Sequence, residues 1–513
     1  MPFLRRALWI VFVVAGALLV VRVFGRPNAV VRSPINVEGL TALAGMLLLV
    51  MAAGVVRPAW QVELSTGACI GILIAAVGAA FWGSLRMPLL SDDYVHLTRV
   101  RNADAHFWMD QFTVVPYDHF FRPIAMYAYK LDSMWAGKSA VAWRSGNLLI
   151  HVINVLLVFF LGRRMGLAKW AALVAALIFG WHGSRPETVA WVAARFDLLA
   201  VMFLLASLLL LYRYVEQRAT LTFLAALIAG VAALLSKESA FVWPAAASLL
   251  LWRRLSLRAQ VSIYGVTAAV FLYRLQLLGG IGGYGSEAGQ PTIFNFSLLR
   301  TANALLLRLW ATLWFPLNWD AAPGLAVSVC MVAMLGSMAW VLWKKPAVHW
   351  RALAFVFLAA LPVQHMLLIG ADLEKSRVLY LPSVGFGILI ACALQSVPRS
   401  AGLTAAAMVL VFQLAALQHN LAIWSRVGDL TAEVCTELGG RLNSSGKSAT
   451  VVGVPNVLDG VYFLRQNLGE CVEWHTGVAA ERVQVVDNTS SVVAPLGSLL
   501  LRFDPELRRI VVF

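Results

Sequence analysis

Apolar runs long enough to cross a bilayer recur along most of this chain, and they constrain its fold more than any other feature. A spanning helix needs about 17 to 25 predominantly apolar residues. Of the 513 residues, 60% are hydrophobic and 13% charged, and the mean hydropathy is +0.77, which excludes an ordinary soluble domain. The runs predict an all-α polytopic membrane protein with about 13 transmembrane helices, at residues 7–24, 39–56, 66–84, 143–161, 167–182, 189–212, 219–236, 239–252, 259–277, 324–343, 351–369, 379–396 and 402–420.

Basic residues predict how these helices are oriented, because Lys and Arg near span ends favour the cytoplasmic side. The net charge of +15 is therefore interpreted as a topology signal, and nucleic acid is not expected as a partner. With the basic clusters inside, the outward-facing loops are those that hold Asp92, Glu187, Lys237, Asp320 and Glu374. The run 301–317, which Pro316 interrupts, must then not cross. The clusters are Arg163, Arg164 and Lys169; Arg213 and Arg218; Arg253, Arg254 and Arg258; Lys344, Lys345 and Arg351; and Arg399.

Composition divides the chain into three parts. Residues 1–60 are expected to form two extra N-terminal helices, and residues 61–424 a membrane core with an outer-face loop at 85–142. Residues 425–513 mix short β-rich runs with turn residues and predict a small α+β soluble domain on the outer face. Cys435 and Cys471 both lie there, either as a disulfide or as two buried thiols.

An adjacent acid pair, Asp92 and Asp93 in LLSDDYVHL, opens the long polar loop. Carboxylates at a membrane surface are suited to proton abstraction. The loop also carries His96, Asp118, His119, Arg122 and Asp132, so it is either a paired network or a solvated segment whose charges keep it soluble.

The segment HGSRPETVAWVAARFD, residues 182–197, carries charges where apolar residues would suffice. Glu187 follows Pro186 at a helix start, where capping alone explains a negative charge. Arg195 and Asp197 lie within an apolar run, where isolated charges are costly, so each is expected to have a partner. His182 begins the segment.

Two further segments carry cations at the same face. In LLSKESAFVWP, Ser236 could cap a helix that begins with Glu238, whereas the ammonium of Lys237 suits a phosphate. Arg377 and Tyr380 form a cluster with Glu374 and Lys375 in EKSRVLYLP, again suitable for an anion. Elsewhere Asn147, His151 and Asn154 recur at spacings of four and three, which predicts interhelical hydrogen bonds from one helix face.

The order of these motifs resembles a known family. SDDY, the segment from FRPIAMY to LGRR, WHGSRPETVAWVAARFDLLA, LLSKESAFVWP and EKSRVLYLPSVGF together are similar to bacterial relatives of the transmembrane O-mannosyltransferases, over roughly residues 66–420. These belong to the GT-C superfamily of polyprenyl-phosphate-sugar-dependent glycosyltransferases. The resemblance implies an outer-face active site, a sugar donor on undecaprenyl or dolichyl phosphate, and an acid of the first loop as general base. Many superfamily members pair Asp with Glu there, so Asp92 and Asp93 both remain candidates.

The expected reaction is transfer of mannose or another hexose to an acceptor hydroxyl, with inversion. The cations expected to stabilise the leaving phosphate are Lys237, Arg377, Arg122 and Arg195. No residue spacing predicts a metal site, although a divalent cation is compatible with the acid pair. Supporting roles are expected for His96, His182, Glu187, Glu238 and Tyr380.

Three other interpretations compete with this one. A transporter or flippase of lipid-linked sugars would also carry intramembrane charges. An O-antigen ligase or lipid A modifier would keep the enzyme class and change the acceptor, and a C-terminal working domain would reduce the helices to an anchor. The sequence predicts a multi-pass protein of the bacterial inner membrane with a periplasmic site, and it leaves the sugar and the protein or glycan acceptor unspecified.

Overall fold

The computed structural model describes residues 64–116, 119–283, 297–316, 347–367, 369, 372–487 and 498–512. Several predictions lie outside the described residues: the helices at 7–24, 39–56 and 324–343, the domain 1–60, and Asp118, Asp320, Lys344 and Lys345.

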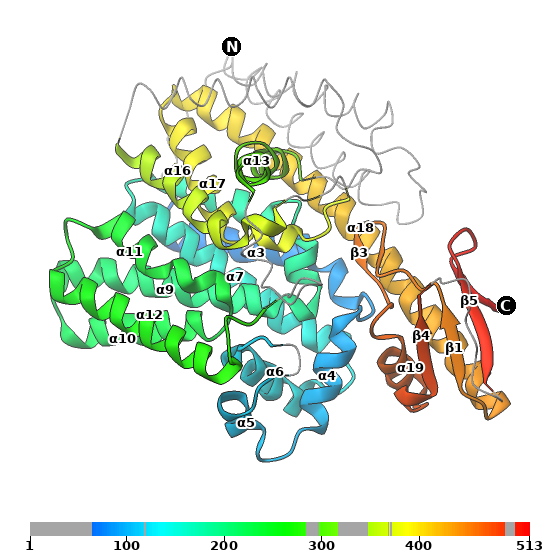
Figure 1. Ribbon diagram of the computed structural model, residues 1–513. Helices are drawn as coiled ribbons and strands as arrows, with labels where there is room; N and C mark the ends of the chain where they lie inside the picture. Colours follow the sequence, from blue (N-terminus) through cyan, green and yellow to red (C-terminus); the bar gives the residue numbers. More distant parts are fainter. Residues whose placement is uncertain are drawn as a thin grey trace, which may run out of the picture.

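The described part of the chain is mostly helical, with a small strand-containing region at its C-terminal end (Figure 1). Four helical segments in this part are long and apolar enough to cross a membrane: Ala140–Arg164, Val192–Gln217, Leu257–Leu278 and Arg399–Ser445. Shorter apolar helices accompany them, so the chain is an integral membrane protein. The predicted count of 13 helices is not established by the described residues.

The described helices of the bundle are α3 (Thr66–Phe81), α7 (Ala140–Arg164), α8 (Lys169–Trp181), α9 (Arg195–Gln217), α10 (Thr220–Leu234), α11 (Trp243–Leu251), α12 (Leu257–Leu278), α16 (Ala347–Ala360), α17 (Pro382–Gln395) and α18 (Arg399–Ser445).

Local signals account for several helix ends. Ser139 and Ser256 cap α7 and α12, because each hydroxyl accepts a hydrogen bond from a backbone N–H of the first turn. Helix α12 ends at Gly279, whose φ of +64° favours glycine. Arg163 and Arg164 lie in the last turn of α7, where the helix dipole favours positive charge.

The segment predicted as a polar loop, 85–142, is itself largely helical. It folds as α4 (Asp92–Asn102), α5 (Phe107–Thr113) and α6 (Pro123–Ala136), preceded by the short turn η1 (Gly83–Arg86). Other short elements connect the long helices: η2 (Pro186–Ala190), η3 (Val192–Ala194), η4 (Glu238–Val242), α13 (Leu298–Asn303), η6 (Ala304–Arg308), α14 (Leu309–Trp314), η7 (Leu361–Met366) and η8 (Ser376–Leu379).

The polar face predicted on α7 makes the expected interhelical hydrogen bonds. Asn147 donates to the backbone oxygen of Trp191 over 3.0 Å, and Asn154 donates to that of Leu198 over 2.9 Å. His151 Nδ1 lies 2.7 Å from the hydroxyl of Tyr380. These three side chains are fully buried, so this face joins α7 to α9 and to Tyr380, which follows η8.

Helix α18 connects the bundle to the C-terminal region and continues through the predicted domain boundary at 424 without a break (Figure 1). Its 47 residues would extend about 70 Å. The following four-stranded sheet has the order β4-β1-β5-β6, with β1 parallel to β4 and β5 and with β5 antiparallel to β6. The elements are β1 (Ala449–Val452), β2 (Val457–Leu458), β3 (Val461–Tyr462), α19 (Leu468–Thr476), η9 (Ala480–Arg482), β4 (Val483–Val486), β5 (Leu499–Asp504) and β6 (Arg509–Val512).

Candidate active site

The two acids of the SDDY segment lie in different environments, although they are adjacent in α4. Asp93 is fully buried, and its two carboxylate oxygens accept hydrogen bonds from the backbone N–H groups of Leu90, at 3.0 Å, and Ala193, at 2.7 Å. Burial raises the pKa of Asp93 to about 7, against the opposing effects of Arg144 and these two N–H groups. A pKa of about 7 would suit a general base, but a general base must first lie within hydrogen-bond distance of the substrate. Asp93 therefore joins the start of α4 to η3.

Asp92 instead lines a cavity of about 460 Å³. It follows Ser91, whose φ of +42° is unfavourable for a residue with a side chain. In the described part of the chain, the acids that line this cavity are Asp92 and Glu374. The residues that line the cavity come from five parts of the chain. They are Ser91, Asp92, Trp191, Arg300, Gln364, His365, Met366, Glu374, Lys375, Arg377, Asn456, Tyr462 and Gln466.

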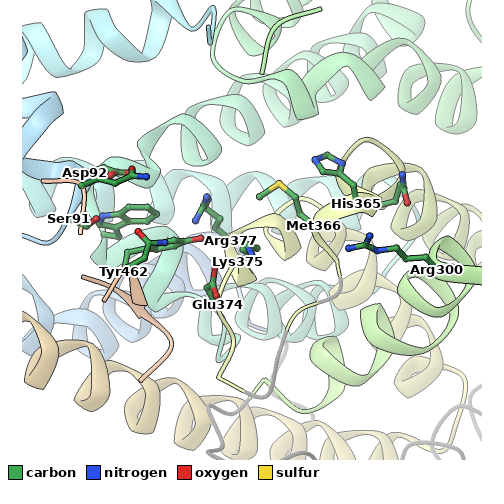
Figure 2. Close-up of a pocket in the computed structure, with 13 residues that line it drawn as sticks. Ser91, Asp92, Arg300, His365, Met366, Glu374, Lys375, Arg377 and Tyr462 are labelled. Carbon is green, nitrogen blue, oxygen red and sulfur yellow. Dashed lines mark ion pairs between the residues drawn. The ribbon is translucent and has the colours of Figure 1, made fainter. Parts of the chain in front are cut away.

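The cavity has an acidic end and a basic end (Figure 2). Asp92 lies at one end beside Tyr462, and Arg300 lies at the other beside His365, with Lys375 and Arg377 between them. Within the described ranges Arg300 has no ion-pair partner, whereas Lys375 forms a partly exposed pair with Glu374 at 3.0 Å. The arrangement can hold an anion at a distance from a carboxylate.

The middle of the cavity wall is an ion pair covered by two aromatic rings. Arg377 lies 2.5 Å from the buried carboxylate of Glu187, which also accepts a hydrogen bond from Ser376 over 3.0 Å. Burial raises the pKa of Glu187, and Arg377 opposes that shift. The guanidinium of Arg377 is 5.1 Å from the ring centres of both Trp191 and Tyr462. Glu187 thus pairs with η8 and does not serve as a helix cap.

A two-residue hairpin brings Tyr462 to this wall. Asp459 and Gly460 both have positive φ, +50° and +78°, and they connect the antiparallel strands β2 and β3. Asp-Gly is a favoured pair at such a turn. The ring of Tyr462 stacks on Trp191 at 4.9 Å with an interplanar angle of 19°. Sequence reasoning did not identify either residue as part of the site, and Asp-Gly was the available signal for the hairpin.

Three of the four cations predicted to hold phosphate are paired away from the cavity. Lys237 forms an ion pair with Asp197 at 2.5 Å, and burial lowers its pKa despite that pair. Arg195 pairs with Asp132, and Arg122 pairs with Glu238 at 2.8 Å. Partners for Arg195 and Asp197 were predicted, and both are confirmed. The structure places only Arg377 of the four on the cavity wall, together with Lys375 of the same predicted cluster. It adds Arg300, which sequence reasoning missed.

The remaining predicted site residues do not line this cavity. His96 stacks on Tyr129 at 5.8 Å, and His182 is buried with its Nε2 lying 3.0 Å from the backbone oxygen of Leu313. Tyr380 is held by His151 and Asn154. Glu238 pairs with Arg274 at 2.8 Å as well as with Arg122, and Ser236 donates to the backbone oxygen of Ala232, so it does not cap a helix at Glu238.

Arg144, which was not predicted, organises the backbone around the acid pair. Its guanidinium is almost fully buried and donates to the backbone oxygens of Met87, Pro88 and Ala190. These contacts join the segment before α4 to η2. The position of the acid pair therefore depends on a buried cation of α7.

We expect Gly146→Ala to destabilise the protein by about 1–3 kcal/mol. A Cβ at Gly146 would lie 2.7 Å from Asp132 Oδ2 and 2.8 Å from Arg195 Nη2, so this partly buried ion pair would have to move. Thermal unfolding of the purified protein in detergent measures the effect. Gly265→Ala is the matched control, because a Cβ at that helical position meets no described atom within 4 Å. Equal melting temperatures for the two variants would contradict this account of Gly146.

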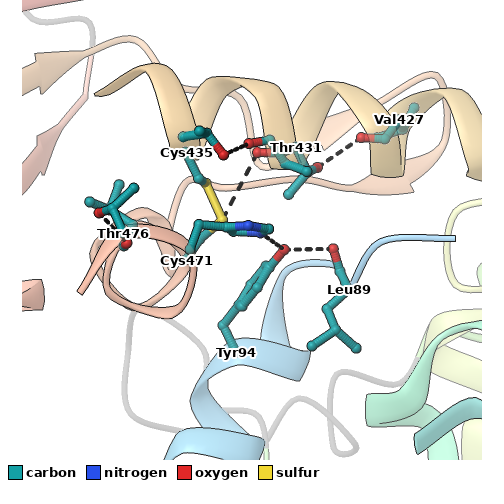
Figure 3. Close-up of a disulfide and its surroundings, with 11 residues drawn as sticks. Leu89, Tyr94, Val427, Thr431, Cys435, Cys471 and Thr476 are labelled. Carbon is teal, nitrogen blue, oxygen red and sulfur yellow. Dashed lines mark hydrogen bonds between the residues drawn. A yellow bond between two sulfur atoms is a disulfide. The ribbon is translucent and has the colours of Figure 1, made fainter. Parts of the chain in front are cut away.

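Cys435 of α18 and Cys471 of α19 form a disulfide, with their Cα atoms 5.9 Å apart (Figure 3). The sequence left open whether these two cysteines form a disulfide or remain buried thiols, and the structure shows the disulfide. The bond fixes α19 to the long helix that leaves the bundle. Among the described residues no group of three His, Cys, Asp or Glu side chains could hold a metal ion.

Residues 119–276 match the family described as dolichyl-phosphate-mannose-protein mannosyltransferase. The match includes Arg122, Glu187 and Lys237, and it leaves Asp92 and Arg377 outside. The family match therefore does not assign a base or a phosphate ligand among the cavity residues.

Three curated relatives of the chain are protein O-mannosyl-transferases. Protein O-mannosyl-transferase TMTC3 of Mus musculus is 24% identical over 152 residues, which cover 27% of this chain and 16% of that protein. Protein O-mannosyl-transferase Tmtc1 of Drosophila melanogaster is 26% identical over 119 residues, covering 23% and 14%. Protein O-mannosyl-transferase TMTC4 of Homo sapiens is 24% identical over 342 residues, covering 53% and 46%. The matches thus span less than half the length of these relatives.

Two crystal structures of ArnT from Cupriavidus metallidurans are similar to the chain. The form bound to undecaprenyl phosphate has a TM-score of 0.46 and 14% identity, covering 86% of this chain and 94% of that one. The apo form has a TM-score of 0.36 and 18% identity, covering 83% and 87%. The chain is thus similar to dolichyl-phosphate-mannose-protein mannosyltransferases over residues 119–276, and to protein O-mannosyl-transferases over part of its length.

Proposed function

We propose that this protein transfers a sugar from a polyprenyl-phosphate donor to an acceptor hydroxyl at the outer membrane face. One observation carries the proposal: Asp92 lines a cavity whose opposite end holds Arg300 (Figure 2). An acid is thereby separated from cations within one site. The family match to an enzyme that uses dolichyl-phosphate-mannose supports a donor of this class.

In the proposed reaction Asp92 is the general base. Its carboxylate takes the proton of the acceptor hydroxyl while that oxygen bonds to the anomeric carbon of the sugar. The bond between the anomeric carbon and the phosphate oxygen breaks, and its electron pair leaves with polyprenyl phosphate. Because this is a single displacement, we expect the configuration at the anomeric carbon to invert.

Arg300 and Lys375 are proposed to hold the donor phosphate, and Arg377 lies beside them on the cavity wall. Charge builds up on the leaving phosphate in the transition state, and preorganised cations stabilise it. Arg300 suits this role because, within the described ranges, no carboxylate already neutralises its guanidinium. A lipid-linked donor also requires the cations to lie at a membrane interface.

Two features support an outward-facing site. Arg144 lies at the cavity end of α7, whereas Arg163 and Arg164 lie about 20 residues later, roughly 30 Å along the helix. Basic residues at that far end favour the cytoplasmic side. The Cys435–Cys471 disulfide is typical of an oxidising compartment such as the periplasm.

Transfer of radiolabelled sugar tests the proposal directly. Membranes that contain the protein would be supplied with polyprenyl-phosphate-linked sugars, mannose first, and the labelled acceptor and its anomeric configuration would be analysed. Membranes without the protein are the control. Movement of the donor across the bilayer without transfer would favour a transporter, and retention of configuration would contradict single displacement.

We expect Arg300→Ala to raise KM for the donor about tenfold, because one charge-assisted hydrogen bond to phosphate is worth about 1.5–3 kcal/mol. Arg308→Ala is the matched control, since Arg308 is exposed in the adjacent turn η6 and does not line the cavity. Initial rates over a range of donor concentrations measure both variants. An unchanged KM in Arg300→Ala would remove Arg300 from the phosphate site.

A further inference from the structure

We infer that Asn467 of the C-terminal region is a positioning residue for Asp92, and that the Cys435–Cys471 disulfide fixes the helix that carries it. The inference rests on the proposed role of Asp92 as the base. It assigns the C-terminal region a part in the reaction that neither the family match nor the motifs suggest.

The contact itself is direct and partly buried. Asn467 Nδ2 donates to Asp92 Oδ1 over 2.8 Å, although the two residues are 375 positions apart in sequence. The same amide lies 3.4 Å from Ser91 Oγ. Asn467 is 5% exposed, so solvent does not compete for its amide. In the described part of the chain no residue hydrogen-bonds to Asp92 Oδ2, which leaves that oxygen to accept the proton.

The geometry of Asn467 is set by α19. Asn467 immediately precedes this helix, and its backbone oxygen accepts a hydrogen bond from the N–H of Cys471 over 3.0 Å. Cys471 is in turn bonded to Cys435 of α18. One turn of helix therefore separates the amide that holds Asp92 from the covalent link to the bundle.

Further contacts hold α19 against α4 (Figure 3). The hydroxyl of Tyr94 donates to the backbone oxygen of Leu89 over 2.8 Å and lies 3.2 Å from His475 Nε2. Lys138 donates to the backbone oxygen of Trp474 over 2.5 Å. The end of α19 is thus fastened to α4 through Tyr94 and to the residues after α6 through Lys138, independently of Asn467.

The chemical consequence concerns orientation and charge. An amide donor stabilises the ionised carboxylate and fixes its rotation, so that Oδ2 stays directed to the cavity. Without it, Asp92 would sample other rotamers next to the unfavourable backbone of Ser91. Around Asp92, α4 carries the titratable groups Asp93 and Tyr94, β3 carries Tyr462, and α19 carries His475. The cavity wall adds Glu374, Lys375 and Arg377 at η8, and Arg300 and His365 at its far end.

The test compares the pH–rate profiles of sugar transfer in wild type, Asn467→Ala and Asn467→Asp. Loss of the donor should lower kcat about tenfold, leave KM for the donor within about twofold, and move the acidic limb of the profile to higher pH. Asn467→Asp should move that limb further, because it places a second carboxylate against Asp92. Asn443→Asp is the matched control, since Asn443 is exposed near the end of α18.

The role of the disulfide is tested by a second experiment. Cys435→Ser with Cys471→Ser should produce the same direction of change, and adding Asn467→Ala to that background should lower kcat by less than it does in wild type. Fully additive effects would show that the disulfide does not act through Asn467 and would overturn that half of the inference.

The failures are distinguishable. If Asp92→Asn retains full transfer, the proposed base is wrong. If Asp92→Asn is inactive while Asn467→Asp keeps the wild-type kcat and acidic limb, the positioning role alone is overturned. Should Asn467→Asp not accumulate in the membrane, Asn467→Ser gives the same readout with a smaller change, and an unmoved limb in that variant also overturns the inference.

Discussion

Asp92→Asn is expected to lower the rate of sugar transfer by about 10²- to 10⁴-fold, the usual contribution of a positioned general base. The amide has the shape of the carboxylate but cannot take the acceptor proton. It can still accept the hydrogen bond from Asn467, so we expect normal protein levels, an intact disulfide and an unchanged melting temperature. Transfer of radiolabelled sugar in membranes measures the loss.

The control for this variant is Asp110→Asn on α5, an acid that does not line the cavity. It should keep the wild-type rate. Equal rates in Asp92→Asn and wild type would exclude Asp92 as the base, and a parallel fall in both variants would indicate a general effect of charge in the segment 85–142.

Asp93→Asn is expected to fail in a different way, through the fold. The carboxylate of Asp93 accepts one backbone N–H with each oxygen, from Leu90 and from Ala193. An amide can accept at one end only, so a buried N–H group would face an NH₂ group without an acceptor. Leaving one such donor unsatisfied costs about 1–3 kcal/mol. Arg144 would also lose the nearby carboxylate that favours its charge.

Thermal unfolding in detergent and the amount of protein in the membrane measure this second effect, with Asp92→Asn as the matched comparison one residue away. We expect a lower melting temperature for Asp93→Asn and little change for Asp92→Asn. A stable Asp93→Asn protein without transfer, beside an active Asp92→Asn protein, would reverse the assignment of the two acids.

The prediction from sequence was most successful where the physical signal is local. Long apolar runs correspond to α7, α9, α12 and α18, because spanning helices require length and apolarity and little else. The spacing of Asn147, His151 and Asn154 was sufficient to place them on one face of α7, and the high cost of an isolated charge in an apolar run was sufficient to predict partners for Arg195 and Asp197. Short β-rich runs likewise became β1, β4, β5 and β6.

The site required information that no local pattern contains. Lys237 and Arg300 are both cations close to apolar helices, yet Lys237 is neutralised by Asp197 whereas Arg300 lines the cavity with Asp92. Which cation remains available depends on how helices distant in sequence pack, and a sequence lists charges without their distances.

The sequence by itself therefore determined that the chain is a helical membrane protein with an acid pair and several cations available for chemistry. Only the tertiary structure decided which acid faces the cavity. Asp92 and Asp93 have the same chemistry and adjacent positions, but successive residues of a helix point about 100° apart. The backbone of Ala193 engages one of them, and Asn467 holds the other at the cavity. Both of these partners come from parts of the chain about 100 and 375 residues away, and only folding brings them there.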